Sequence, residues 1–438
     1  MFKTLKNAWK IDDLRKKMLF SLMIIVLYRL GTTIPIPYVN STALSTSTLM
    51  AGGIFAYLNI LSGSAFANAT LFALGINPYI TASIVMQLLT IAIPALEKMA
   101  KEGEEGQKKI NSITRYVTVG LGIITALGYY QLLKSYNLLI DTGFFPALVI
   151  ITCYSAGASL VMWLAEKVND NGIGNGISLI LLANIVSRLP NTALSLFRLA
   201  TGKVTIGKNN TLIPVWLGII LAILAIAIAV AMVGFIVWMT NSERRIPIQY
   251  AKRVVGRKMY GGQSSNLPIK VNMVGVMPII FASSICSIIP TIQAFTNPTK
   301  GSFWDKFCNF FGTGSWFYPL MTFVLIIAFA YFYTSISFNP VEVSNNLKQN
   351  GGSIPGIRPG RPTAEYITKI LNRVTFIGAL LLAVVAIFPM IINIASGGSL
   401  SALAFGGSSI IIVVGVILET VREIEAQMTM RNYKGFLG

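Results

Sequence analysis

Two stretches of the sequence, GINPYITAS at 75–83 and GVMPIIFAS at 275–283, share the pattern GxxPxIxAS. Each stretch opens an apolar run, and these runs are the second and the seventh of ten candidate membrane spans. The pattern therefore divides the chain into two halves of five spans. An odd number of spans per half gives the halves opposite orientations, as in many transport folds with a central pathway. Because Gly and Pro are common in membrane helices, a chance match is the alternative.

The composition indicates a polytopic, all-α membrane protein. Of the 438 residues, 54% are hydrophobic and 12% are charged. This charged fraction is about half of the roughly 25% found in ordinary globular chains. So few charges cannot cover a soluble surface, and the chain is too apolar to be disordered.

Ten apolar stretches approach the length of about 20 residues that a helix needs to cross a bilayer. The first continues through Arg29 without a small-residue cleavage site, so we expect it to be retained rather than removed as a signal sequence. The fifth is the weakest, because Arg188 and Pro190 interrupt it. The stretches lie at 18–37, 74–96, 116–136, 144–165, 177–195, 212–240, 271–292, 315–338, 374–395 and 402–420. The expected halves are 1–205 and 206–438.

The net charge of +19 fits either a nucleic-acid binder or a membrane protein with basic cytoplasmic loops. With the N-terminus inside, 27 of the 35 Lys and Arg residues fall on the cytoplasmic side and 7 fall outside. This bias predicts that both termini are cytoplasmic. Only the region 196–211, which is predicted to lie outside, carries several basic residues against this bias. Two basic cytoplasmic loops are larger than topology alone requires, and they lie at 244–270 and 348–373. They belong to the longer connections 241–270 and 339–373.

Charged residues within the spans are few. No carboxylate lies in the middle of a span, since Glu166 and Glu419 sit at cytoplasmic ends. A proton or cation carrier that uses carboxylates is therefore disfavoured, although coordination by backbone carbonyls or by Ser, Thr and Asn stays open. Arg29 lies near the outer end of the first span, where snorkelling or a backbone-carbonyl partner would satisfy its charge.

Pairs of Gly and Pro predict broken or kinked helices. Within a membrane, such irregular backbone is tolerated only where it is buried in protein or lines a water-filled space. Besides the two repeat motifs, Gly172, Gly174 and Gly176 and the pair Gly406 and Gly407 mark such places. These segments present aliphatic side chains, which would form a constriction that blocks ions by dewetting, or would simply be packing residues. The aliphatic residues are Ile76, Ile80, Ile177, Leu181, Ile280 and Ile410 to Ile412.

Two further features concern the outer loop and the cysteines. The stretch 55–72 is uncharged, too short to span and rich in small residues, which suits a re-entrant helix or an external loop. Cys153, Cys286 and Cys308 are widely separated, and the chain contains no His. The common zinc and thiol-redox sites are thus excluded, no cofactor is expected, and the cysteines are interpreted as packing residues.

Several longer runs carry a specific family signal. They are TIPIP (33–37), LSGSAF (61–66), LFALGINPYITASIVMQLL (71–89), GIGNGISLI (172–180), LPIKVNMVGVMPIIFASSI (267–285), NNLKQNGGSIPGIRPGRPTAEYI (345–367) and FGGSSIIIVV (405–414). These runs occur in the same order as in the SecY family and extend over essentially the whole chain. The sequence therefore resembles the SecY family, whose members are the central subunits of the bacterial protein-conducting channel. The resemblance implies a central hourglass pore between two inverted, pseudo-symmetric halves.

The resemblance also implies roles for individual residues inside the membrane. The hydrophobic pore ring of the family matches Ile76, Ile80, Leu181, Ile280 and Ile412, with Leu181 standing where the family often has Ile. The short plug helix that closes the outer funnel matches residues of about 58–70, with SGSAF in place of the more usual SGGAL-type run. Its central residues are Leu61, Ser62, Gly63, Ser64, Ala65 and Phe66. The lateral gate, formed by spans two, seven and eight, matches Ser83, Gln87, Pro278, Ser283 and Ser284.

The same resemblance implies a function for the basic loops. In the family they dock the ribosome or the motor SecA, and the matching residues are Lys252, Arg253, Arg257, Lys258 and Arg358. Basic side chains suit ribosomal RNA phosphates in a salt-sensitive contact. The implied partners are SecE, SecG, SecA, the ribosome, signal sequences, nascent polypeptides and lipids, in the cytoplasmic membrane.

No phosphate-binding loop or metal cluster appears in the sequence, so the expected function is a passive conduit and lateral insertase, and not an enzyme. Two other functions stay open. A small-solute secondary transporter would also use five-plus-five inverted repeats, but the missing central carboxylates and the large basic loops count against it. A membrane scaffold for the ribosome leaves the broken helices unexplained.

Overall fold

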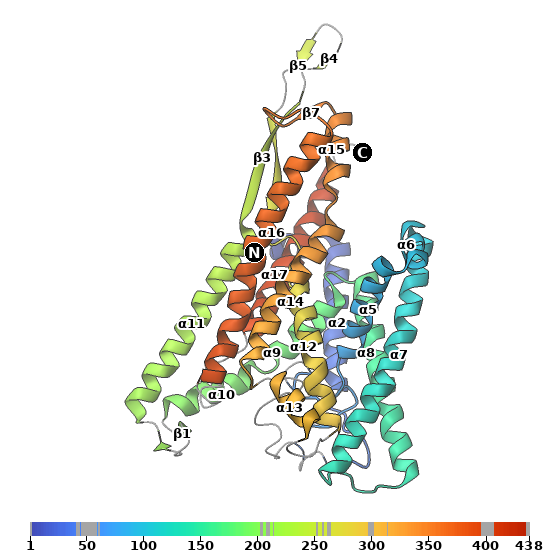
Figure 1. Ribbon diagram of the computed structural model, residues 1–438, viewed down its shortest axis with the longest axis vertical. Coiled ribbons are helices and arrows are strands. Elements are labelled where there is room, and N and C mark those ends of the chain that lie inside the picture. Colours follow the sequence, from blue (N-terminus) through green and yellow to red (C-terminus); the bar gives the residue numbers. More distant parts are fainter. Residues whose placement is uncertain are drawn as a thin grey trace.

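The computed structural model of the chain is mainly helical, in agreement with the predicted class (Figure 1). It describes residues 2–40, 44, 59, 62–201, 205, 206, 211, 212, 214–250, 253–255, 258–260, 264–296, 302–312, 314–395 and 407–434. Leu61, Lys252, Arg257 and Gly406, which the sequence singled out, lie outside these residues.

The first half of the chain forms a bundle of long helices with short partners. Its helices are α1 (Phe2–Trp9), α2 (Asp12–Gly31), α5 (Asn77–Ala92), α6 (Pro94–Lys101), α7 (Glu104–Ser135), α8 (Phe144–Asn171), α9 (Gly176–Val186) and α10 (Leu189–Ala200). The short strands β1 (Thr205–Ile206) and β2 (Thr211–Leu212) pair with each other before the second half begins.

The second half repeats this arrangement. Its helices are α11 (Val215–Asn241), α12 (Met277–Thr296), α13 (Phe303–Phe310), α14 (Phe317–Ser337), α15 (Pro340–Gln349), α16 (Arg361–Ala395) and α17 (Gly407–Lys434). Its strands are β3 (Glu243–Tyr250), β4 (Arg253–Val255), β5 (Lys258–Tyr260), β6 (Ser264–Lys270) and β7 (Gly352–Ser353).

Helix packing follows the same plan in both halves. In the first half α5 packs on α7, α7 on α8, and α8 on α2 and α9. In the second half the helices at the corresponding places do the same: α12 packs on α14, α14 on α16, and α16 on α11 and α17. The pairs α2–α9 and α11–α17 complete the correspondence. Contacts between the halves run from α12 to α5 and α7, from α17 to α9 and α1, and from α11 to α10.

Six helices of the described part are long and apolar enough to cross a membrane, or seven if the bent pair α5 and α6 is one span. The apolar part of α12 is shorter than this length. The count of ten spans therefore stays a prediction. The fifth predicted span corresponds to one of these six, Gly176–Arg198, which has a turn between α9, ending at Val186, and α10, beginning at Leu189, just before Pro190.

Two predicted span boundaries were wrong, and in both cases Pro is the reason. The first helix spans Asp12–Gly31, not 18–37, because the prolines of TIPIP hold the preceding residues in extended backbone. The second apolar stretch was predicted as one span over 74–96. The chain bends there by 99° between α5 and α6, at Ile93, directly before Pro94.

The basic loop after α11 is a β-hairpin, which the all-α prediction did not include. β3 pairs antiparallel with both β6 and β7, and β4 with β5 forms a second ladder that lies at the far end of the molecule (Figure 1). Ile246, Ile248 and Ile269 face inward from β3 and β6. Ile246 and Ile269 pack with Ile367 of α16, so the hairpin is attached to the start of that helix.

Candidate functional site

The two repeat motifs adopt the same local structure. Gly75 and Gly275 both have left-handed backbone, with φ of +57° and +67°. In each repeat a helix begins two residues later, and the amide of the Ile at the sixth motif position donates to the carbonyl at the second. These bonds join Ile80 to Ile76 at 3.0 Å and Ile280 to Val276 at 3.2 Å. The motifs thus start α5 and α12 after a turn, and Gly is needed for the positive φ.

The residues matched to the pore ring gather in one place. Ile76 and Ile80 lie at the start of α5, Ile280 at the start of α12, and Leu181 and Ile412 on α9 and α17. Each is at most 4% exposed, and all five belong to one hydrophobic cluster shared by both halves. Ile411 is also buried in this cluster, and Ile177 and Ile410 pack against it. Their role as a pore constriction stays a prediction.

The glycine-rich run before α9 allows that helix to lie close to α8. A Cβ atom on Gly176 would stand 2.0 Å from the carbonyl oxygen of Ala165, so only Gly fits there. The Asn175 side chain caps the helix by accepting from the amides of Ile177, at 3.0 Å, and Ser178. These local features place Leu181 in the shared cluster.

Within the segment matched to the plug, the described residue Asn59 is helical, but the part from 62 to 70 is not. Residues 62–70, called the plug segment below, form successive turns that end in an isolated bridge from Thr70 to Pro35. Gly63, Ser64 and Ala69 have φ values of +64°, +74° and +45°, which an α-helix excludes. Residues 62–70 therefore do not continue the helix to which Asn59 belongs, and sequence composition does not reveal these left-handed residues.

The plug segment is held from several sides. The Tyr129 hydroxyl on α7 donates to the Phe66 carbonyl at 2.6 Å, and both rings pack in a second buried cluster. The Ile36 amide donates to the Ala69 carbonyl at 3.1 Å. Arg29 of α2 donates to the Gly63 carbonyl at 3.4 Å and to the Ala183 carbonyl of α9. Backbone carbonyls therefore satisfy Arg29, as the second of the two sequence alternatives predicted.

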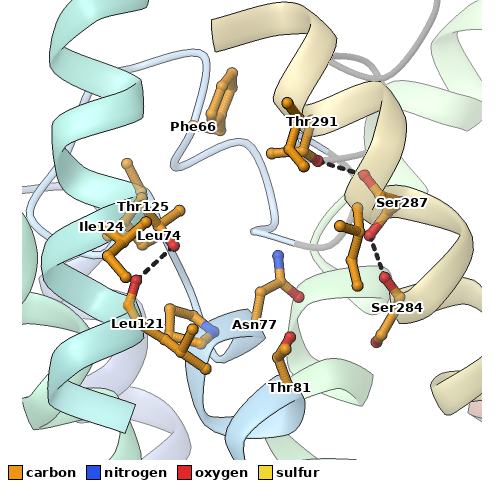
Figure 2. Close-up of a pocket in the computed structure, with 14 residues that line it drawn as sticks. Phe66, Leu74, Asn77, Thr81, Leu121, Ile124, Thr125, Ser284, Ser287 and Thr291 are labelled. Carbon is orange, nitrogen blue, oxygen red and sulfur yellow. Dashed lines mark hydrogen bonds between the residues drawn. The ribbon is translucent and has the colours of Figure 1, made fainter. Parts of the chain in front are cut away.

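A cavity of about 320 Å³ opens between α5, α7 and α12, beside the plug segment (Figure 2). Asn77 and Thr81 of α5 face Ser284 and Ser287 of α12 across it, and Phe66 lies at one end. We call this space the outer cavity. Of its polar lining residues the sequence had singled out Ser284 for the gate, whereas Asn77 and Thr81 had been noted only within the repeat motif.

A second cavity, of about 390 Å³, lies toward the charged ends of α7 and α8, and we call it the inner cavity. The Tyr333 hydroxyl of α14 donates to Gln87 Oε1 of α5, and Gln87 Nε2 donates to Ser83 Oγ at 3.2 Å. This chain of hydrogen bonds joins the two halves. Ser83 and Gln87 had been predicted as gate residues, but Tyr333 had not, because it lies in an aromatic-rich apolar run without a distinguishing signal.

The other predicted gate residues lie in α12 itself. Pro278 is buried in the first turn, where the missing amide costs no helix hydrogen bond. Ser283 is buried, and its hydroxyl donates to the Ile280 carbonyl at 2.9 Å. The Ser284 hydroxyl donates to the same carbonyl at 2.8 Å. Neither Pro278 nor Ser283 lines the outer or the inner cavity.

The predicted docking residues that the structure describes lie on the two connections of the second half. Arg253 and Lys258 lie in β4 and β5, at the far end of the hairpin (Figure 1). Arg358 is exposed in the turn before α16. All three therefore lie at the end of the molecule that carries β7 and α15 (Figure 1).

The three cysteines are free thiols, and Cys286 and Cys308 are buried. Cys286 Sγ lies 3.4 Å from Thr322 Oγ1, and Cys153 packs against the buried cluster around Tyr129. The interpretation of the cysteines as packing residues is confirmed.

Comparisons with known proteins agree with this geometry. The chain is 44% identical to a protein translocase subunit SecY of Streptomyces coelicolor over 452 residues, covering all of both chains. It also matches three solved structures with 16% to 17% identity, each over 94% of this chain and 92% of the other. They are a protein-conducting channel (TM-score 0.61), a SecY protein whose plug domain stabilises the closed state of the translocation channel (0.59), and Sec61 in the canine ribosome–channel complex (0.58).

The SecY family model matches residues 70–421, which include both repeat motifs and the shared cluster. The match covers most of the chain, and the full-length relative agrees with it. This chain therefore belongs to the SecY family of multi-span membrane proteins.

Proposed function

We propose that this chain forms a gated, protein-conducting channel for unfolded polypeptides, closed at rest by the shared hydrophobic cluster and the plug segment. The observation that carries the proposal is the buried aliphatic set at matched helix starts in both halves. Such a set excludes water and ions, and offers no specific hydrogen bonds to a moving chain. The two halves are residues 1–205 and 206–438.

The seam between α5 on one side and α12 and α14 on the other is the proposed lateral gate. A hydrophobic signal sequence would insert between these helices and favour the open state by binding it better than the closed state. The outer and inner cavities along this seam support the proposal, because packing is already incomplete there. Opening would release apolar segments sideways into lipid.

The chain is proposed to be passive, with energy supplied by SecA or by chain elongation on the ribosome, and with SecE and SecG as companion subunits. The proposed location is the cytoplasmic membrane, with both termini in the cytoplasm. The excess of Lys and Arg in the predicted cytoplasmic segments supports this orientation.

Reconstitution tests the function directly. The chain is placed in proteoliposomes with SecE and SecG, and a secretory preprotein is added with SecA and ATP. We expect the preprotein to become protected from external protease only when all components are present. A small-solute transporter would instead show counterflow of a solute in vesicles that contain this chain alone. Absence of protected preprotein would contradict the proposed function.

Reversing two charges in the hairpin should weaken ribosome binding. Arg253→Glu with Arg257→Glu is expected to raise the Kd about tenfold or more at low salt, because repulsion replaces phosphate contacts. Arg244→Glu with Arg245→Glu changes the net charge equally at the base of the same hairpin, where both side chains are exposed, and should have a smaller effect. Binding to ribosomes is measured across a salt titration. Equal affinities for the two double variants would contradict the docking assignment.

Removing one hydroxyl should ease opening of the lateral gate. Tyr333→Phe deletes the hydrogen bond to Gln87 across the seam, which is worth about 0.5–1.5 kcal/mol. We therefore expect faster translocation of preproteins with weakened signal sequences. Tyr331→Phe, which removes a hydroxyl that donates to Asn372 within the second half, is the matched control. The same rate increase in both variants would show that the seam bond is not the cause.

A further inference from the structure

One guanidinium joins three segments of the chain near the outer end of the first span. Arg29 Nη1 donates to the Gly63 carbonyl of the plug segment at 3.4 Å. Arg29 Nη2 donates to the Ala183 carbonyl of α9. The side chain itself extends from the last turn of α2. Two long helices and the plug segment therefore meet at a single charged group.

The electrostatic surroundings favour a cation at this point. α2 ends at Gly31 and α9 ends at Val186, so Arg29 is bound near the C-terminal ends of two helices. Such ends carry partial negative charge, and the Ala183 carbonyl, which also accepts from the Ser187 amide at 3.1 Å, has a second lone pair for Arg29. None of the ion pairs among the described residues includes Arg29. Its charge is therefore balanced by backbone carbonyls and not by a carboxylate.

The plug segment fits against Arg29 without spare room. Gly63 has a φ of +64°, and a Cβ atom built on it would lie 2.8 Å from Asn184 Oδ1. The same atom would lie 2.9 Å and 3.0 Å from the two terminal nitrogens of Arg29. A side chain at position 63 would be strained by the positive φ, and the ends of the Asn184 and Arg29 side chains would have to shift to make room for it. Close packing therefore favours Gly at position 63, in addition to the positive φ of the turn.

The second polar attachment of the plug segment differs in kind. Three residues after Gly63, the Phe66 carbonyl accepts from the neutral Tyr129 hydroxyl on α7 at 2.6 Å. The Phe66 and Tyr129 rings also pack at a centroid distance of 4.5 Å. Phe66 is thus fixed by a buried aromatic cluster, whereas Gly63 depends on Arg29. Ser62 and Ser64, on either side of Gly63, hydrogen-bond only within residues 59–68 in the bonds described, so the bond from Arg29 is what ties this part of the plug segment to α2.

We propose that Arg29 is a latch that holds the plug segment in the closed position. It is a positioning residue, because it acts on the plug segment and not on the transported chain. When Gly63 moves away, the hydrogen bond from Arg29 to the Ala183 carbonyl remains. Opening therefore does not leave the guanidinium without a hydrogen-bond partner inside the membrane. Ala183 lies two residues beyond Leu181, so the latch also joins the plug segment to a helix of the shared cluster. The inference rests on the proposed channel function.

The test uses the full chain with SecE and SecG in a parent lacking Cys153, Cys286 and Cys308. Ser64→Cys is added, and its modification by a membrane-impermeant maleimide from the outer side reports the plug position. Arg29→Gln should raise both this rate and the resting ion conductance about tenfold or more, because a charged hydrogen bond is lost. Arg29→Lys should give an intermediate rise, because an ammonium keeps the charge but not the fork geometry. Arg198→Gln, a charge removal at an exposed position of α10, should change neither.

A second variant makes the result independent of Arg29 itself. Gly63→Ala keeps the charge of Arg29 but strains the backbone at a φ of +64° and displaces the end of the Arg29 side chain, so it should also raise both measurements. Unchanged modification and conductance in Arg29→Gln, or in Gly63→Ala if the former does not assemble, would overturn the latch. A parent complex that translocates no preprotein would instead count against the proposed function. A rise in Arg198→Gln equal to that in Arg29→Gln would also overturn the latch.

Discussion

Replacing Ile80 by Asn is expected to turn the resting channel into an ion leak. The side chain is 2% exposed in the hydrophobic cluster that both halves share, and an amide there would attract water into a dry constriction. Lowering the barrier to ions by about 1.4 kcal/mol raises the conductance about tenfold. Ile280→Asn, at the matched position of the other repeat, and Ile412→Asn should act in the same direction. Single-channel recording of the reconstituted complex measures the effect.

Ile84 provides the control for Ile80. It lies one turn further along α5, is 3% exposed, and belongs to the same cluster, but it is not a predicted ring residue. Ile84→Asn introduces the same buried amide, with the same cost of about 1–3 kcal/mol in stability. We expect it to destabilise the protein without a comparable leak. Equal conductance in the two variants would mean that the ring does not form the constriction.

The same ring variants should relax the requirement for a good signal sequence. A polar residue in the closed cluster destabilises the closed state relative to the open state, so a weaker signal suffices to shift the equilibrium. Translocation of a preprotein with a defective signal sequence measures this shift. Ile280→Val keeps the surface apolar and should leave the requirement nearly unchanged.

The features that the sequence predicted correctly are those with local signals. The repeat motif fixes where α5 and α12 begin, because a left-handed Gly and a Pro at the helix start each impose their own backbone geometry. Apolar length located most of the spans, and the family runs placed all five ring residues in one cluster. These properties depend on short stretches and can be read without knowing what packs against them.

The features that the sequence did not predict depend on distant partners or on a short alternation of buried and exposed residues. The run ERRIPIQY at 243–250 buries Ile246 and Ile248 and exposes the residues between them, a strand pattern that a search for helices overlooks. The plug segment is shaped by Tyr129, Arg29 and the isolated bridge to Pro35, so its turns are set by tertiary contacts. Tyr333 becomes distinctive only because Gln87 lies opposite it.

Joining α5 to α12 across the outer cavity should block translocation completely. Thr81 and Ser287 line this cavity from opposite halves, so a bismaleimide bridge between Thr81→Cys and Ser287→Cys would fix the seam (Figure 2). A signal sequence that must separate these helices could then no longer enter. We expect the bridged complex to protect no preprotein, while each single-Cys variant, modified at one end only, stays active. The parent lacks Cys153, Cys286 and Cys308.

The control places the same bridge in the same cavity without crossing the seam. Thr81 and Thr125 both line the outer cavity, but α5 and α7 belong to the first half and pack against each other directly. A bridge between Thr81→Cys and Thr125→Cys fills the space equally and leaves α12 free to move. If this bridge also abolished translocation, filling of the cavity and not fixation of the seam would be the cause. Retained activity with the first pair bridged would exclude α5 and α12 as the two sides of the gate, because no polypeptide segment can pass between helices that are covalently tied.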